Sequence, residues 1–373
     1  MSLKEILQEK VVTKLRQNQN NHMHFVERIQ NESQLLNDFV LPIGKGSPVS
    51  FEANGSVKMI VKSGGDMHDE YGLHPHAVYQ LGEKLIPNNE GRIATYLKNQ
   101  TLMNEHWRNE LVATILNTHS TNTKHRERVL VREIESEVRG VLSDHYRRLD
   151  TKHIFTSFIN SVAKYETQVF DAFTDGLKSY IEVINPELVE IPFSNKEHTF
   201  VVFGSRISNS DFGDGALDLR SFIMQAVCIN GLVTESKIRE VHLGRKLPDD
   251  LQLSRDTYLY DSRTQASLVS DVVDNIFSVK SIAAYCNKIQ DMEDYKVESM
   301  DNEIKRLQKV GVQKGEVEQM KEIFIKNDPN DGINGQNSLW KLAQGLSAVA
   351  RDKDSRRKRE LEEISGKLFE RIK

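Results

Sequence analysis

The spacing of apolar residues changes along this chain, and that change limits the fold more than any other feature. Near the N-terminus apolar residues recur every three or four positions, which is the period of a helix face. The same period returns beyond Leu251, whereas the section between holds short apolar runs separated by turn residues. These patterns predict an α+β fold. We expect a central, mostly antiparallel sheet, flanked by an N-terminal mixed helical region and a helical C-terminal third.

Local signals refine this division. Val49 to Ala53 and Val57 to Val61 flank Asn54-Gly55, which suits a two-residue hairpin turn. Two apolar runs farther along are expected to pair as strands around Ser136. The first 17 residues read as an amphipathic helix, followed by a polar stretch, Gln17 to His24, and Ala216 to Val233 reads as one strand. The predicted parts are a mostly helical N-terminal region with a hairpin near 49–61 (1–122), a β-rich central domain with a basic segment (123–250) and a helical C-terminal region (251–373).

Composition excludes several classes of protein. With 38% hydrophobic and 28% charged residues and only 8 prolines, the 373-residue chain is neither disordered throughout nor linker-dominated. Its net charge of -4 means that attraction to nucleic acid has to come from local patches. Two cysteines fit a reducing compartment, and we find no secretory signal. The most apolar stretch, Ile223 to Val233, is too short to span a bilayer, so we expect a cytoplasmic protein without a membrane segment.

A basic segment near the start of the central domain is the main candidate for nucleic-acid contact. Alternate residues of a strand share a face, so its arginines could present their guanidinium groups to successive phosphates. An aromatic residue beside two arginines is a pairing that stacks on unpaired bases. The alternative is a solvated face of paired charges, with the tyrosine as a half-buried strand residue. The candidate residues are Lys124, Arg126, Arg128, Arg132, Arg139, Tyr146, Arg147 and Arg148.

A second basic cluster lies near the C-terminus, in a predicted helix that follows the apolar stripe around Trp340. Arg356 and Arg357 are its candidate contact residues. A basic helix can track a phosphate backbone, and a solvated terminal helix is the equally weighted alternative.

Motifs for catalysis are absent from the sequence. Gly44-Lys45-Gly46-Ser47 lacks the spacing of a phosphate-binding loop, and the histidines lack the helical spacing of a zinc site. A metal-dependent nuclease needs clustered carboxylates, for which Asp211, Asp214 and Asp218 are the tight candidates, with a solvated turn as the alternative. Cys228, in an apolar strand, reads as a buried and inert thiol. We therefore expect no catalytic residue, no metal and no cofactor.

The run Leu142-Ser143-Asp144-His145-Tyr146-Arg147-Arg148-Leu149-Asp150 resembles a motif of a phage- and plasmid-borne family catalogued as a domain of unknown function. Val227-Cys228-Ile229-Asn230-Gly231 and Ser338-Leu339-Trp340-Lys341-Leu342 resemble two further motifs of that family, with Gln225 and Ala226 around its usual basic position and Lys341 at its glycine. The similarity spans roughly 56 to 350. The family has no established activity, and its members look like parts of mobile-element DNA-metabolism modules, so the resemblance points toward DNA.

Together these patterns predict a nucleic-acid-binding protein of a phage or mobile element. We expect it to bind single-stranded DNA, to act as an annealing-like accessory of recombination or replication, and to form a homo-oligomer. Two alternatives stay open. The section from Lys164 to Arg220 holds ten acids and five bases, which would suit a non-enzymatic interaction or inhibitor protein that acts on a host protein. A metal-dependent nuclease is the second alternative.

Overall fold

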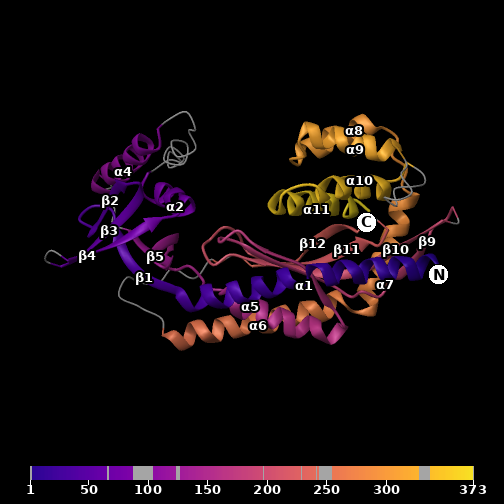
Figure 1. The fold of residues 1–373 in the computed structure, drawn as a ribbon, viewed down its shortest axis with the longest axis horizontal. Coiled ribbons are helices and arrows are strands. Elements are labelled where there is room, and N and C mark those ends of the chain that lie inside the picture. The colour runs from indigo at the N-terminus through magenta and orange to yellow at the C-terminus, as the bar shows by residue number, and fades with distance from the viewer. Residues whose placement is uncertain are drawn as a thin grey trace.

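The computed structural model describes residues 2–64, 67–86, 104–122, 127–195, 197–227, 229–240, 242, 254–326 and 337–372. It confirms the α+β fold and shows two six-stranded sheets where one was expected, because the predicted central domain supplies strands to both. The first lobe, β1 to β6 with α2 and α4, lies at one end of the elongated molecule (Figure 1). The second lobe contains β7 to β12 and the other helices.

The first sheet has the order β1-β5-β6-β4-β3-β2 and is antiparallel except for the parallel pair β4 and β6. The hairpin predicted near 49–61 is confirmed, with Gly55 at φ +74° in its turn. The strands predicted to pair around Ser136 do so, and Glu135 and Ser136 both have positive φ. The strands are β1 (Leu36–Ile43), β2 (Val49–Asn54), β3 (Ser56–Gly64), β4 (Met67–Leu73), β5 (Glu127–Ile134) and β6 (Glu137–Ser143).

Helices α2 (Pro75–Leu85) and α4 (Glu105–Asn122) pack on one face of this sheet, over Val129, Val131 and Val141. Helix α4 also closes the free edge of β2. The side-chain amide of Asn117 accepts from the Phe51 N–H at 2.8 Å and donates to the Phe51 carbonyl at 2.6 Å. At Phe51 the edge strand therefore has both backbone groups already bonded.

The second sheet has the order β12-β11-β10-β8-β7, and β9 pairs with β10. Ala216 to Val233, expected to be one strand, forms β11 and the start of β12, which pair as a hairpin after the chain reverses beyond Gln225. Both faces of β8 are buried along its whole length, which shows that helices cover the sheet on two sides. The strands are β7 (Gln168–Thr174), β8 (Ser179–Ile184), β9 (Val189–Pro192), β10 (His198–Asn209), β11 (Leu217–Gln225) and β12 (Asn230–Glu240).

Two helical layers enclose the second sheet (Figure 1). Helices α5 (Thr151–Val162) and α6 (Arg255–Ile276) cover one face through Phe158 and Val273. Helices α10 (Leu339–Arg351) and α11 (Ser355–Phe369) lie over the other, with α8 (Met300–Lys309) and α9 (Lys314–Lys326) stacked beyond them. Helix α7 (Val279–Asp294) joins this group near β9, where the Ser338 hydroxyl at the start of α10 donates to Glu293 at 2.6 Å.

Helix α11 is anchored to the sheet by buried charges. Arg206 of β10, which is 2% exposed, forms ion pairs with Glu182 of β8 and Glu362 of α11. Arg359 of α11 lies over the Tyr180 ring at 4.9 Å. Gly366 permits this close approach, because a Cβ atom there would lie 1.6 Å from the carbonyl oxygen of Val233.

Helix α1 (Leu3–Leu35) is longer than the predicted 17 residues, since the polar stretch from Gln17 to His24 contains no glycine or proline and continues the helix. A capping box formed by Ser2 and Glu5 starts it. Leu7, Val11 and Leu15 are buried against the second sheet. The helix then passes directly into β1, because Leu36 both caps α1 and begins the strand.

Candidate nucleic-acid interface

Arg132 of β5 lies between the two lobes and is 1% exposed. Its guanidinium donates to Asp38 at 2.8 Å, to Asp150 at 2.7 Å and to the carbonyl of Asp211 at 2.8 Å. These contacts join β1, the segment before α5 and the turn after β10. All of its donor nitrogens face protein acceptors, so Arg132 holds the lobes together and has no exposed surface for a phosphate.

The other described arginines of β5 and β6 are also paired. Arg139 reaches Glu32 of α1 at 3.1 Å and Glu137 at 2.9 Å, and its side chain is 17% exposed. Arg128 lies 3.7 Å from Asp144, and each of these side chains is 27% exposed. Lys124 and Arg126 lie outside the described residues. The predicted row of arginines along one strand is therefore a set of separate ion pairs in its described part.

Tyr146 is 8% exposed and stacks on the ring of His242, with the ring centroids 4.9 Å apart. Its hydroxyl donates to the carbonyl of Ser210 at 3.1 Å, and burial raises its pKa above the usual value. Burial also lowers the pKa of His242 to about 4, although the Arg147 carbonyl opposes that shift. Tyr146 is therefore a packed aromatic residue between the lobes. It is more deeply buried than the half-buried strand residue that was its alternative, and it lies after the end of β6.

Arg147 and Arg148 reach the surface beside this stack. Arg147 forms a bidentate pair with Asp261 of α6 and lies 3.5 Å from Glu240. Arg148 approaches Asp38 at 3.0 Å. Their side chains are 22% and 23% exposed. Of the predicted basic segment, these two residues lie side by side at the rim of the junction between the lobes.

Next to Arg147, helix α6 presents an aromatic residue that the sequence patterns did not single out. Tyr260 is 65% exposed and adjoins Asp261, the partner of Arg147. The guanidinium carbon of Arg263, one turn farther along, lies 6.0 Å from the centre of the Tyr260 ring. This surface, which we call the Tyr260 patch, consists of Tyr260, Arg263 and Arg147. The usable sequence signal was the i, i+3 spacing of Tyr260 and Arg263 on a predicted helix.

The C-terminal cluster is tied down as well. Arg357 donates to Glu316 of α9 at 2.6 Å and to Glu360 at 2.7 Å. Arg356 is 56% exposed and approaches Asp214 at 3.3 Å. Arg357 connects α11 to α9, and Arg356 connects α11 to the turn after β10. Arg132 donates to the Asp211 carbonyl of that same turn, and Arg139 lies 6.0 Å from the centre of the Phe212 ring. The two predicted basic clusters therefore approach each other at this turn, through arginines that are already paired.

The three carboxylates considered for a nuclease have separate partners. Asp211 accepts from the N–H and hydroxyl of Thr151, both at 2.8 Å, and burial, with the charge of Asp150, raises its pKa to about 6. Asp214 approaches Arg356, and Asp218 pairs with Arg220 at 2.6 Å. Within the described residues, no three His, Cys, Asp or Glu side chains are grouped so as to hold a metal ion. Cys228 lies outside the described residues.

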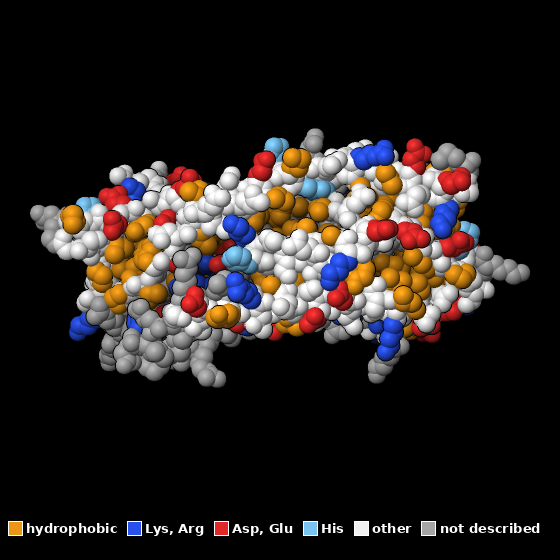
Figure 2. Space-filling model, turned by 90° about the horizontal axis from the view of Figure 1, so that it is seen from below, with side chains coloured by type: hydrophobic (Ala, Val, Ile, Leu, Met, Phe, Trp, Pro, Cys, Tyr) orange, Lys and Arg blue, Asp and Glu red, His pale blue; other side chains and the backbone are white. Residues whose placement is uncertain are grey.

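The charges on the face shown in Figure 2 are mixed. Its Lys and Arg side chains stand singly or in small groups among Asp, Glu and hydrophobic patches. That face shows no broad basic field among its described residues, so attraction of a polyanion to it is local.

Comparison of the chain with protein-family models, with curated proteins and with solved structures found no match. Among the described residues, no helix has the length and apolar character needed to cross a membrane.

Proposed function

We propose that this chain is a cytoplasmic protein that binds single-stranded nucleic acid, DNA above all, as an annealing-like accessory of recombination or replication in a phage or mobile element. The observation that carries the proposal is the Tyr260 patch, where the guanidinium of Arg263 lies beside an exposed aromatic ring and the adjoining Asp261 holds Arg147. The resemblance of the segment 142–150 to a family of mobile elements supports DNA as the ligand.

The chemistry of the patch suits an unpaired base. An exposed tyrosine ring offers a stacking surface worth about 1 to 3 kcal/mol per base, and it does so for any sequence. Arg263 beside the ring supplies positive charge for a flanking phosphate, whereas Asp261 and Glu240 already compensate the charge of Arg147. Asp261 holds Arg147 in position through two contacts. Bases in a duplex are already stacked, so the patch favours single strands over double strands.

The test is binding of a fluorescent single-stranded oligonucleotide, and of its duplex, at about 50 and about 200 mM salt. Tyr260→Ala and Arg263→Ala should each weaken single-strand binding by about tenfold, whereas Tyr260→Phe should retain it. Tyr295→Ala and Arg306→Ala are the matched controls, since these residues are 46% and 62% exposed, Tyr295 just after the end of α7 and Arg306 in α8. Equal binding by wild type and both patch variants would overturn the proposal.

A further inference from the structure

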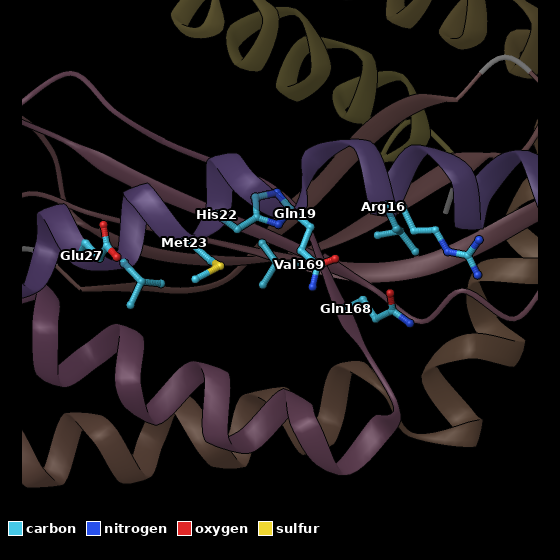
Figure 3. A pocket seen from close by; sticks show the side chains of 9 residues that line it. Arg16, Gln19, His22, Met23, Glu27, Gln168 and Val169 are labelled. Atoms are coloured by element: carbon cyan, nitrogen blue, oxygen red, sulfur yellow. The ribbon is translucent and has the colours of Figure 1, made fainter.

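A groove of about 580 Å³ runs between α1 and the edge strand β7 (Figure 3). Met23 of α1 and Val169 of β7 lie at its middle, while Arg16 and Glu27 lie at its two ends. Met23 is 61% exposed and Val26 beside it is 48% exposed. The groove therefore presents apolar surface to solvent between a cation and an anion.

The charges at the ends belong to one face of one helix. Arg16 and Glu27 are eleven positions apart, which is three turns, or about 16 Å along the axis, and nearly the same direction around it. Arg16 has no acidic partner in the part of the chain that the structure describes. The Nδ1 atom of His24 lies 3.7 Å from a carboxylate oxygen of Glu27, and both of these side chains are largely exposed. Each end is thus open to a partner of opposite charge.

We propose that a second copy of this chain docks on the groove, with its own α1 antiparallel to the first. A two-fold axis near the middle of the groove would place Arg16 of each copy beside Glu27 of the other and cover Met23 in both. An interface of this symmetry has to be self-complementary, and a helix face with opposite charges at its ends and apolar side chains between them meets that condition. The anchoring of α1 by Leu7, Val11 and Leu15 presents this face on a rigid element.

The experiment is sedimentation of the full chain without nucleic acid, so its outcome is independent of the proposed function. Arg16→Glu places acid opposite acid at both ends of the interface, and Glu27→Arg places base opposite base. Each single variant should dissociate about tenfold more readily than wild type, or more. The double variant Arg16→Glu, Glu27→Arg should associate as wild type does, because it exchanges the charges and restores both pairs.

A mixture of the two single variants, Arg16→Glu and Glu27→Arg, gives the sharpest result. In that mixture one chain carries acid at both ends of the groove, and its partner carries base at both ends. Opposite charges then face each other at both ends of the interface, so we expect the mixture to form a heterodimer that is tighter than the homodimer of either variant alone.

Lys305→Glu and Glu318→Arg are the matched controls, because they make the same changes of charge at exposed positions of α8 and α9. They should sediment as wild type, and circular dichroism should show the same helix content in every variant. Three results would overturn the proposal: a wild-type chain that stays monomeric up to about 100 µM, single variants that associate like wild type, or a mixture that does not form the heterodimer.

Discussion

The ring of Tyr146 lies flat on the imidazole ring of His242, with the two planes 8° from parallel. Two backbone contacts flank this stack, since the Arg147 N–H donates to the His242 carbonyl at 3.0 Å and the His242 ring contacts the Arg147 carbonyl at 3.0 Å. The segment that leaves the first sheet after β6 is thereby fixed to the end of the second sheet. An aromatic residue and an arginine that are neighbours in sequence consequently have different roles, one inside the junction and one at its rim.

Removing the hydroxyl of Tyr146 should affect stability and leave ligand binding unchanged. Tyr146→Phe loses the hydrogen bond to Ser210, which should lower the free energy of unfolding by about 1 kcal/mol. Its affinity for a single-stranded oligonucleotide should equal that of wild type, whereas Tyr260→Ala should show the opposite pattern. Urea unfolding and oligonucleotide titration of both variants make the comparison, and weaker binding by Tyr146→Phe would count against our placement of the interface.

Loss of the Arg132 guanidinium should destabilise the junction between the lobes. Arg132→Ala removes the buried guanidinium from Asp38 and Asp150. Because both carboxylates are partly exposed and Asp38 keeps Arg148, we expect a loss of about 3 kcal/mol, at the lower end of the range for a broken buried pair. Urea unfolding measures the change. Arg306→Ala, at an exposed position of α8, serves as the control and should stay within about 0.5 kcal/mol of wild type. Similar stability of the two variants would show that the ion pairs at the junction contribute little.

Glu293 should make stability fall between acid and neutral pH. Burial raises its pKa from 4.5 to about 7, with Glu197 and Asp294 adding to the shift and Ser338 and Lys341 opposing it. Because the pKa in the folded state is the higher one, the folded state holds the proton more tightly than the unfolded state does. The contribution of Glu293 to stability is therefore fully present below about pH 4.5 and is lost as the pH rises to about 7.

Glu293→Gln isolates this effect, since the amide keeps the shape of the side chain and does not titrate. Between about pH 4.5 and 7, wild type should lose on the order of 2 kcal/mol more stability than the variant. Unfolding in urea at steps of pH gives both curves. Parallel curves for the two proteins would mean that Glu293 ionises in the folded state as it does in the unfolded chain.

Gly366→Ala should destabilise the protein although alanine is the better helix former. A Cβ atom at this position would collide with the Val233 carbonyl, so α11 has to move away from β12. We expect a loss of about 3 kcal/mol, as for other overpacked sites. Gly315→Ala in α9 is the control, because a Cβ atom there meets nothing within 4 Å. Its stability should equal or exceed that of wild type, and thermal unfolding of both variants tests the contrast.

The parts of the fold that the sequence predicts are those set by neighbouring residues. Asn54-Gly55 specifies a hairpin through the backbone conformations that it tolerates, and the apolar periods separate helices from strands. The division into two sheets depends on contacts between distant segments. β1 pairs with β5 across about ninety residues, and no local pattern records that pairing.

The candidate interface shows the same limit. Arg132 looks like any strand arginine until Asp38, Asp150 and Asp211 arrive from three other segments of the fold. The sequence does not distinguish Tyr260 from the other tyrosines, because an exposed tyrosine on a helix differs from a buried one only through its tertiary surroundings. Residue type and spacing thus identify which groups are charged or aromatic, whereas the packing of distant segments decides which of them meet solvent.

The direct passage from α1 into β1 has a mechanical consequence. A helix of 33 residues behaves as a stiff rod about 50 Å long, and at its end Leu36 belongs at once to the helix cap and to the first sheet. No linker separates the helix from the strand. In addition, Arg139 of the first sheet forms an ion pair with Glu32, one turn before the end of α1. A displacement of α1, such as one caused by a second molecule that binds to its exposed face, should therefore move β1, the edge strand of the first lobe.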